Sequence, residues 1–224
     1  MSSIRPTNLN SVQGSVPGQE RSDPGKGVVG VQLHKRDVVA KAAAILDGYG
    51  IADLTMRRLA RELEVTPGAL YWHFANKQEL LGAVADRILA GVDDVSAHWR
   101  IRIADICGQL RDALLSHTDG AELVSASFAA GQSRAVEQIL AVLAEAAGEA
   151  GVDSAHRVQA ARTVLHYVLG ATADEQSRLQ WDAAGAELSE TSTPPADPSA
   201  GFAFGLRLLT DGLAAQRSFA DSAR

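Results

Sequence analysis

The sequence predicts an all-α fold in which a three-helix head with a helix-turn-helix precedes a helical body, without a β-sheet. Apolar residues recur at helical spacing along most of the chain from residue 34 to residue 217, which is typical of amphipathic helices. Aromatic residues make up only 5% of the chain and β-branched runs are few, so strand patterns are absent. Hydrophobic residues make up 46% of the 224 residues, which is enough for a sizeable core.

The first segment differs in composition from the rest. Residues 1–33 contain five Gly, three Pro and five Ser without an apolar period, so we expect a disordered arm. Three cations in this arm offer contacts to DNA, although a solvated tail is the simpler interpretation: Arg5, Arg21 and Lys26. Residues 34–49 then show helical spacing, and Gly50 ends this first helix.

Residues 54–77 have the pattern of two short helices joined by a tight turn. Thr55 is expected to cap the first helix and Thr66 the second, where Pro67 occupies a first helical position that needs no backbone N–H. Two apolar residues direct the second helix toward the core: Leu70 and Phe74. Hydrogen-bond donors are left on its outer side: Tyr71, Trp72, His73 and Lys77. This pattern predicts a helix-turn-helix, whose second helix enters the major groove of DNA.

Helical spacing continues beyond the helix-turn-helix. Asn76 is expected to cap a helix from Lys77 to about Val92. Five further helices are predicted at residues 98–116, 120–130, 132–150, 154–181 and 199–217. Residues 183–199 are predicted to form a flexible loop, because they contain Gly185, Pro194, Pro195 and Pro198. The expected domains are therefore the head at residues 34–80 and a C-terminal domain at residues 81–220.

The distribution of charge limits where nucleic acid can bind. The net charge of −6 argues against a protein that coats nucleic acid with its whole surface. Residues 34–80 carry seven Lys or Arg and six Asp or Glu, whereas residues 81–224 carry eleven and nineteen. Contact with DNA should therefore be confined to the first third of the chain.

Several functional classes lack a motif in this sequence. The single cysteine, Cys107, fits a reducing cytoplasm, and neither a membrane-spanning run nor a secretory signal is present. The histidines and Cys107 lack the spacing of a zinc site, so we expect no metal and no cofactor. No nucleophile elbow, phosphate loop or dinucleotide fingerprint occurs, so an enzyme is not expected.

On these residues the chain resembles the TetR family of bacterial transcriptional repressors, and in particular its tetracycline-repressor branch. The resemblance rests first on the residues of the second short helix, Leu70-Tyr71-Trp72-His73 with Asn76-Lys77. Weaker matches follow in the same order at residues 99–115, 166–170, 174–176 and 202–213. The resemblance implies an all-α dimer with a DNA-binding head and a body that binds a ligand and dimerises.

Residue by residue, the resemblance implies which side chains contact DNA. Arg57 matches a base-contacting arginine, and arginine can bind O6 and N7 of guanine together. Pro67, Gly68 and Ala69 stand where the branch has glutamine, proline and threonine, so the operator should differ from the tetracycline operator. The small Gly68 and Ala69 allow a closer approach to DNA. The expected DNA contacts are Thr55, Met56, Arg57, Thr66, Pro67, Gly68, Ala69, Tyr71, Trp72, His73 and Lys77.

The expected ligand site departs further from the branch. Val124 replaces a histidine that helps to hold the tetracycline-bound magnesium, and Ile106 replaces an asparagine that binds the drug. A magnesium chelate is therefore not expected, because Mg²⁺ needs oxygen ligands in octahedral array. His166 and Asp174 match the branch, although a core histidine and a solvated turn are the alternatives. The expected ligand residues describe a mostly apolar pocket: Ile106, Leu110, Val124, Ser127, Phe128, His166 and Asp174.

Together these features predict a ligand-responsive repressor that binds a palindromic operator as a homodimer and is released by a mostly apolar small molecule. The expected interface is a four-helix bundle formed by residues 154–181 and 199–217 of each subunit. Its apolar positions are Val158, Ala161, Leu165, Leu169, Phe202, Leu206, Leu209 and Leu213. Two alternatives remain: a regulator that binds DNA but no ligand, and a helical carrier or enzyme whose head only packs.

Overall fold

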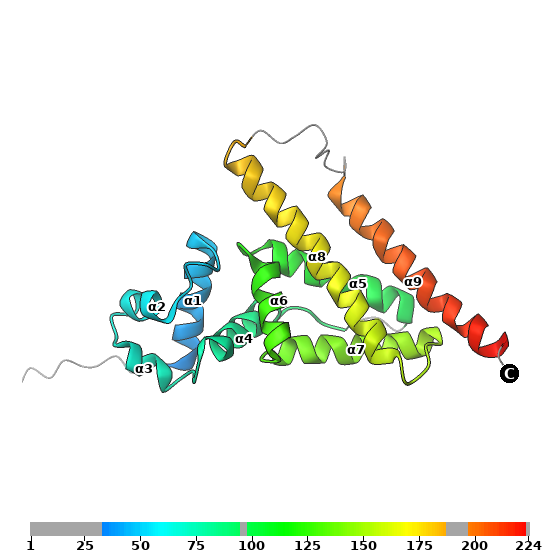
Figure 1. Cartoon of the computed structure of the whole chain (residues 1–224), viewed down its shortest axis with the longest axis horizontal. Coiled ribbons are helices and arrows are strands. Elements are labelled where there is room, and N and C mark those ends of the chain that lie inside the picture. The colour runs from blue at the N-terminus through cyan, green and yellow to red at the C-terminus, as the bar shows by residue number, and fades with distance from the viewer. Residues whose placement is uncertain (1–32, 95–97, 187–196, 223–224) are drawn as a thin grey trace, which may run out of the picture. The chain divides into compact units, whose positions relative to one another are not determined.

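The computed structural model describes residues 33–94, 98–186 and 197–222, and the regular elements in these ranges are all α-helices (Figure 1). In chain order they are α1 (Lys35–Tyr49), α2 (Met56–Glu62), α3 (Pro67–Tyr71), α4 (Lys77–Ile88), α5 (Trp99–Leu115), α6 (Gly120–Ala130), α7 (Arg134–Ala150), α8 (Arg157–Ala183) and α9 (Pro198–Ser222). The prediction of an all-α fold is confirmed over these ranges. None of these helices combines the length and the apolarity that a membrane crossing requires. The expected N-terminal arm lies outside the described residues, apart from Leu33.

The helices α1, α2 and α3 form the head, and local side chains start α2, α3 and α4 where predicted. The Thr55 hydroxyl accepts a hydrogen bond from the Arg58 N–H (3.1 Å), and the Thr66 hydroxyl accepts one from the Ala69 N–H (3.3 Å). Asn76 caps α4 in the same way. These caps satisfy N–H groups that the first turn of a helix leaves free. The head encloses fully buried side chains: Val38, Leu46, Leu54, Leu59, Leu70 and Phe74.

The helix α4 runs from the head into the body without a break. Gly82 lies so close to the turn between α6 and α7 that a Cβ atom there would overlap the carbonyl oxygen of Gln132. Asp86 accepts a hydrogen bond from the Ser133 hydroxyl (2.7 Å) and another from a backbone N–H in the first turn of α7 (2.9 Å). The expected boundary between head and body therefore falls inside α4, and the described residues from Leu33 onward form one compact unit.

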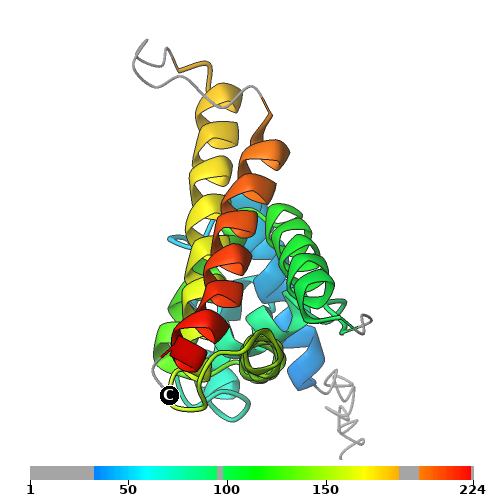
Figure 2. The same ribbon diagram turned by 90° about the vertical axis from the view of Figure 1, so that its right-hand side faces the viewer.

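The helices α5 to α9 form the body. α8 and α9, yellow and orange in Figures 1 and 2, run side by side. Tyr167 of α8 donates a hydrogen bond to the carbonyl of Phe202 in α9 (2.7 Å), and their ring centroids stack 5.5 Å apart. The opposite side of α8 packs into the core through Ala161, Val164, Leu165, Val168 and Leu169.

Some helix ends differ slightly from the prediction. α8 begins at Arg157, because Asp153 first forms a turn by accepting a hydrogen bond from a backbone N–H two residues later (2.9 Å). α9 begins at Pro198, which was predicted to lie in the loop. The Asp197 carboxylate accepts a hydrogen bond from the first turn of α9 (3.0 Å), and proline is well tolerated at a first helical position. Residues 187–196 of the predicted loop lie outside the described residues.

Candidate DNA interface and ligand region

The start of each helix in the helix-turn-helix presents a hydroxyl group to solvent. Thr55 and Thr66 are exposed, and capping α2 and α3 uses only lone pairs of their hydroxyl oxygens. Each hydroxyl therefore keeps its hydrogen for an outside acceptor such as a phosphate oxygen. Met56 is half-buried and packs against the core, which leaves only part of its side chain for an outside contact.

Arg57 and Arg58 are neighbours in sequence with different surroundings. Arg57 is exposed, and its guanidinium has no acidic or aromatic partner within the described residues. Arg58 is half-buried, forms an ion pair with Asp53, and lies over the Tyr49 ring with its guanidinium carbon 3.7 Å from the centroid. Arg58 therefore holds α2 against the end of α1, whereas Arg57 is free to bind a base or a phosphate.

The helix α3 and the residue that follows it expose large aromatic side chains. Trp72 is 91% exposed and Tyr71 is 53% exposed, so both lie on the outer side, where the positions of Leu70 and Phe74 predicted them. The first residues of α3 are small, with Pro67 and Gly68 exposed and Ala69 half-buried. Two further predicted contacts are half-buried: His73 and Lys77. The predicted DNA residues of α3 therefore all have accessible surface.

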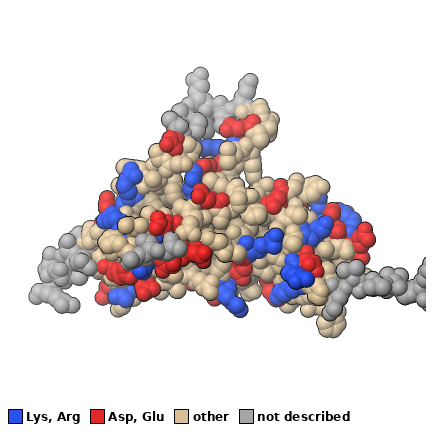
Figure 3. Space-filling model, turned by 180° about the vertical axis from the view of Figure 1, so that it is seen from behind, with Lys and Arg blue, Asp and Glu red and all other residues tan. Residues whose placement is uncertain are grey.

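The charges of the head are unevenly paired. Lys35 binds Glu79 (3.0 Å), while the Ala75 N–H and then Lys35 lower the pKa of Glu79, because both stabilise its carboxylate. Other cations lack an acidic partner within the described part of the chain: Arg57, Arg61 and Lys77. On the face shown in Figure 3, Lys and Arg side chains lie at the end that carries the head and also along the body, with acidic groups among them. Unpaired cations are the ones that phosphates can bind without breaking an ion pair.

The seven expected ligand residues lie in different surroundings in the described part of the chain. Four of them are buried in the body: Ile106, Leu110, Val124 and Ser127. Phe128 is half-buried, and the exposed His166 ring lies 5.6 Å from it, so His166 is not a core histidine. Asp174 is exposed and lines a cavity between α8 and α9, whereas Ile106 lines a different cavity beside α4 and α7. Within the described ranges, His, Cys, Asp and Glu nowhere gather in a group that could hold a metal ion.

A buried amide that sequence reasoning did not single out joins three helices. Gln176 of α8 is buried, and its Nε2 donates hydrogen bonds to the carbonyls of Leu114 (2.9 Å) and His117 (2.7 Å). Its Oε1 accepts a hydrogen bond from the Ala121 N–H (3.0 Å). These bonds satisfy backbone groups at the end of α5 and the start of α6. Only the packing reveals this role, because a glutamine between charged and polar neighbours on a helix has no distinctive pattern.

The turn between α5 and α6 also bonds to the head. Asp119, in the left-handed conformation with φ of 52°, accepts hydrogen bonds from the Ile51 N–H (2.9 Å) and from the Gln180 side chain (2.6 Å). Asp47 near the end of α1 lies 2.9 Å from Nδ1 of His117. This turn therefore connects α8 with the head by a route that does not pass through α4.

Both parts of the chain match known families of proteins. Residues 38–84 match the family described as bacterial regulatory proteins, tetR family, and residues 93–194 match the tetracyclin repressor-like C-terminal domain. The class A tetracycline repressor from transposon 1721 of Escherichia coli is 32% identical over 205 residues, covering 83% of this chain and 93% of the repressor. The class E repressor of Escherichia coli is 34% identical over 199 residues, covering 83% and 92%.

Solved structures extend the similarity to three dimensions. BioQ of Mycobacterium smegmatis is 64% identical, with a TM-score of 0.77, and the match covers 83% of this chain and 99% of that chain. BioQ with its natural double-stranded DNA operator is 62% identical, with a TM-score of 0.72 and coverages of 82% and 99%. A TetR variant of Acinetobacter baumannii in complex with minocycline is 32% identical, with a TM-score of 0.62 and coverages of 83% and 99%. The similarity thus includes head and body alike.

Proposed function

Because this chain belongs to the TetR family of bacterial regulatory proteins, we propose that it is a repressor that binds a palindromic operator in double-stranded DNA as a homodimer and is released by a small molecule. The family was predicted from the residues around α3, and that prediction is confirmed. Its members are DNA-binding transcriptional regulators, the class that the sequence favoured over an enzyme. Because its proposed target is bacterial DNA, we expect the protein to act in the cytoplasm.

The exposed aromatic surface of α3 is the observation that carries the proposal. Trp72 is 91% exposed, although large aromatic side chains are highly buried on average. It follows the helix that a helix-turn-helix inserts into the major groove, and Tyr71 lies directly before it. An indole N–H and a phenol O–H both suit phosphate or base acceptors. BioQ, at 62% identity, is solved with its operator, and we infer that this chain binds an operator with the same surface.

A second copy of the chain is the proposed partner of α8 and α9. One helix-turn-helix covers only half of a palindromic site, so two are needed. Large apolar side chains are exposed on these two helices: Val158, Leu179, Trp181, Phe204 and Leu208. Four residues that were expected in the interface are instead buried within the subunit: Ala161, Leu165, Leu169 and Leu206. The proposed four-helix bundle therefore uses the outer sides of α8 and α9.

The released state requires a ligand that binds one conformation of the dimer better than another. A variant of TetR from Acinetobacter baumannii is solved with minocycline. In this chain Ile106 and Val124 are buried apolar residues, which favours a mostly apolar molecule bound without an obligatory metal. α4 and the turn between α5 and α6 are two routes by which the body can move the recognition helices. By linkage, operator DNA weakens ligand binding by the factor by which the ligand weakens operator binding.

Binding to the duplex upstream of its own gene tests the DNA-binding role. Lys77→Ala should weaken binding to all sequences and lower the slope of log K against log salt by about one for each subunit. Arg87→Ala is the matched control, because it removes the same charge from the last turn of α4, about 15 Å away, and should leave the slope nearly unchanged.

Two outcomes would contradict the proposal. The DNA-binding role fails if the protein neither retards the upstream fragment nor enriches any sequence from a pool of random duplexes. The proposed homodimer is contradicted if the protein without DNA stays monomeric at micromolar concentration in sedimentation experiments.

A further inference from the structure

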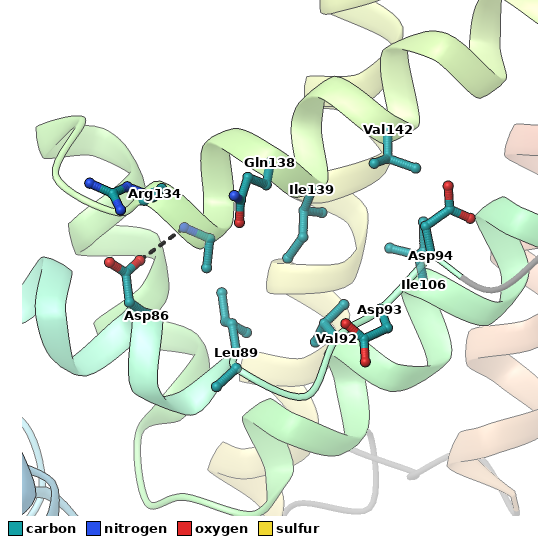
Figure 4. A pocket seen from close by; sticks show the side chains of 12 residues that line it. Asp86, Leu89, Val92, Asp93, Asp94, Ile106, Arg134, Gln138, Ile139 and Val142 are labelled. Atoms are coloured by element: carbon teal, nitrogen blue, oxygen red, sulfur yellow. Dashed lines mark hydrogen bonds between the residues drawn. The ribbon is translucent and has the colours of Figure 1, made fainter.

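A cavity of about 360 Å³ lies between the end of α4, residues 92–94, α5 and α7 (Figure 4). Its floor is apolar and includes the buried Leu89, Ile106 and Ile139. Val142 of α7 lines it as well and is half-buried. Charged and polar side chains surround this floor: Asp86, Asp93, Asp94, Arg134 and Gln138. A concave site with an apolar floor and polar groups around it suits an amphipathic small molecule.

The charged groups at the rim differ in how far they are already paired. Asp86 and Arg134 lie at one end of the cavity, and Asp93 and Asp94 lie at the other (Figure 4). Asp86 accepts two hydrogen bonds at the start of α7, and Asp94 lies 3.4 Å from the guanidinium of Arg102. The Asp93 carboxylate has no partner within the described residues, since only its backbone is bonded, to the side chain of Gln109. One end of the cavity therefore presents an acceptor with free lone pairs.

We infer that this cavity binds the effector of the proposed repressor and that the effector is an amphipathic ammonium compound. Its apolar body would cover Leu89, Ile106 and Ile139, and its ammonium group would donate hydrogen bonds to the Asp93 carboxylate. At the far end Arg134 offsets the negative charge of Asp86, so no net charge favours a second cationic group there. That the bound molecule is an effector rests on the proposed function, whereas its binding to the cavity does not depend on that function.

The position of the cavity explains how a molecule bound there affects DNA binding by the head. The helix α4 begins at Lys77, a predicted DNA contact, and its last turn lines the cavity. Asp86 and the close approach of Gly82 hold α4 to the start of α7 beside the cavity. A molecule between α4 and α7 must bind differently when the distance between these helices changes, and this is the condition for coupling to the head.

Three probes with the same apolar body and different charge test the inference: hexylammonium, hexanol and hexanoate. Each is titrated into the full-length protein without DNA and followed by heteronuclear NMR. We expect hexylammonium to bind most tightly and hexanoate most weakly, with amide shifts at Ala90 and Ala135 in the wall of the cavity. Equal or tighter binding of hexanoate overturns the inference, as do shifts confined to Val124 and Ser127 in the core.

Substitutions separate the charge from the cavity. Asp93→Asn should weaken hexylammonium about threefold to fivefold, as for a partly exposed ion pair, and leave hexanol unchanged. Glu145→Gln, on an exposed part of α7 outside the cavity wall, removes the same charge and should change neither probe. Val142→Trp fills the cavity and should abolish both. Equal effects of Asp93→Asn and Glu145→Gln on hexylammonium contradict a site at Asp93.

Operator binding, measured with and without hexylammonium, keeps the two proposals apart. We expect hexylammonium to weaken operator affinity and the operator to weaken hexylammonium by the same factor. Operator binding together with no probe binding refutes the cavity and leaves the repressor role standing. Probe binding by a protein that binds no duplex refutes the repressor role and leaves the cavity standing.

Discussion

Replacing Gly68 with alanine separates the stability of the head from its fit to DNA. Gly68 is the second residue of α3 and is exposed, and a Cβ atom placed on it meets only the Thr66 hydroxyl oxygen, at 3.8 Å. This is an ordinary van der Waals distance, and Gly68 is not one of the described glycines with positive φ. The free protein has room for the extra methyl group, so packing within the chain does not require glycine here.

The substitution should change stability and affinity in opposite directions. Alanine favours a helix over glycine by up to ~1 kcal/mol, so the free energy of unfolding should rise by a few tenths of a kcal/mol or more. That raises Tm by about 2–4 °C at most for a domain of this size. In the complex, the same methyl group lies where the start of a recognition helix approaches base edges. Overpacking a close contact costs ~1–3 kcal/mol, which is about a fivefold to 150-fold rise in Kd.

Thermal unfolding and fluorescence anisotropy with the operator duplex measure the two effects. Gly48→Ala is the matched control, because Gly48 lies in α1 with nothing within 4 Å of an added Cβ atom and lies outside the helix-turn-helix. It should stabilise the protein and leave operator affinity unchanged. The reasoning is refuted if Gly68→Ala binds the operator as tightly as the native protein, or if Gly68→Ala lowers Tm.

Three further predictions follow from the side-chain contacts. Arg57→Ala should cost roughly 1–3 kcal/mol of operator affinity and relax specificity at one base position without changing Tm. Arg58→Ala should instead lower Tm, because it removes the ion pair with Asp53 and the packing on Tyr49. Equal losses of affinity for operator and random DNA in Arg57→Ala would argue against base reading. Gln176→Leu leaves the Ala121 N–H without a partner and removes one of the hydrogen bonds that each of the Leu114 and His117 carbonyls accepts. It should lower the free energy of unfolding by about 1–3 kcal/mol in denaturant titrations, beyond the loss in an exposed Gln180→Leu control. Burial raises the pKa of the Cys107 thiol to about 12, so the thiolate is scarce in the folded protein at neutral pH, and labelling by a thiol reagent should stay slow until the protein is unfolded; rapid labelling of the native protein would show that this region opens.

The head was predictable because its features are local. A capping side chain, the N–H that it binds and the apolar residues of the next turn all lie within a few positions of one another, so Thr55, Thr66 and Asn76 indicate three helix starts from sequence alone. The same holds for the aromatic residues of α3, because Leu70 and Phe74 face the core and so leave Trp72 on the outer side. The family and the outward position of the predicted DNA contacts follow from this short stretch.

The body depends on contacts between residues far apart in the chain, and these only the tertiary structure decided. Helical spacing marks one apolar side of α8, but it does not say whether that side meets the subunit's own core or a second copy, so Ala161, Leu165 and Leu169 were assigned to the wrong neighbour. Gln176 shows the same limit, since its partners lie 55 to 62 residues away. A buried amide is stabilising only when distant groups are placed to bond it, and no local pattern records where those groups will be. The sequence by itself determined the family and the residues that we propose to contact DNA. The packing decided which side of α8 is free, how the body is joined to the head, and where a cavity remains.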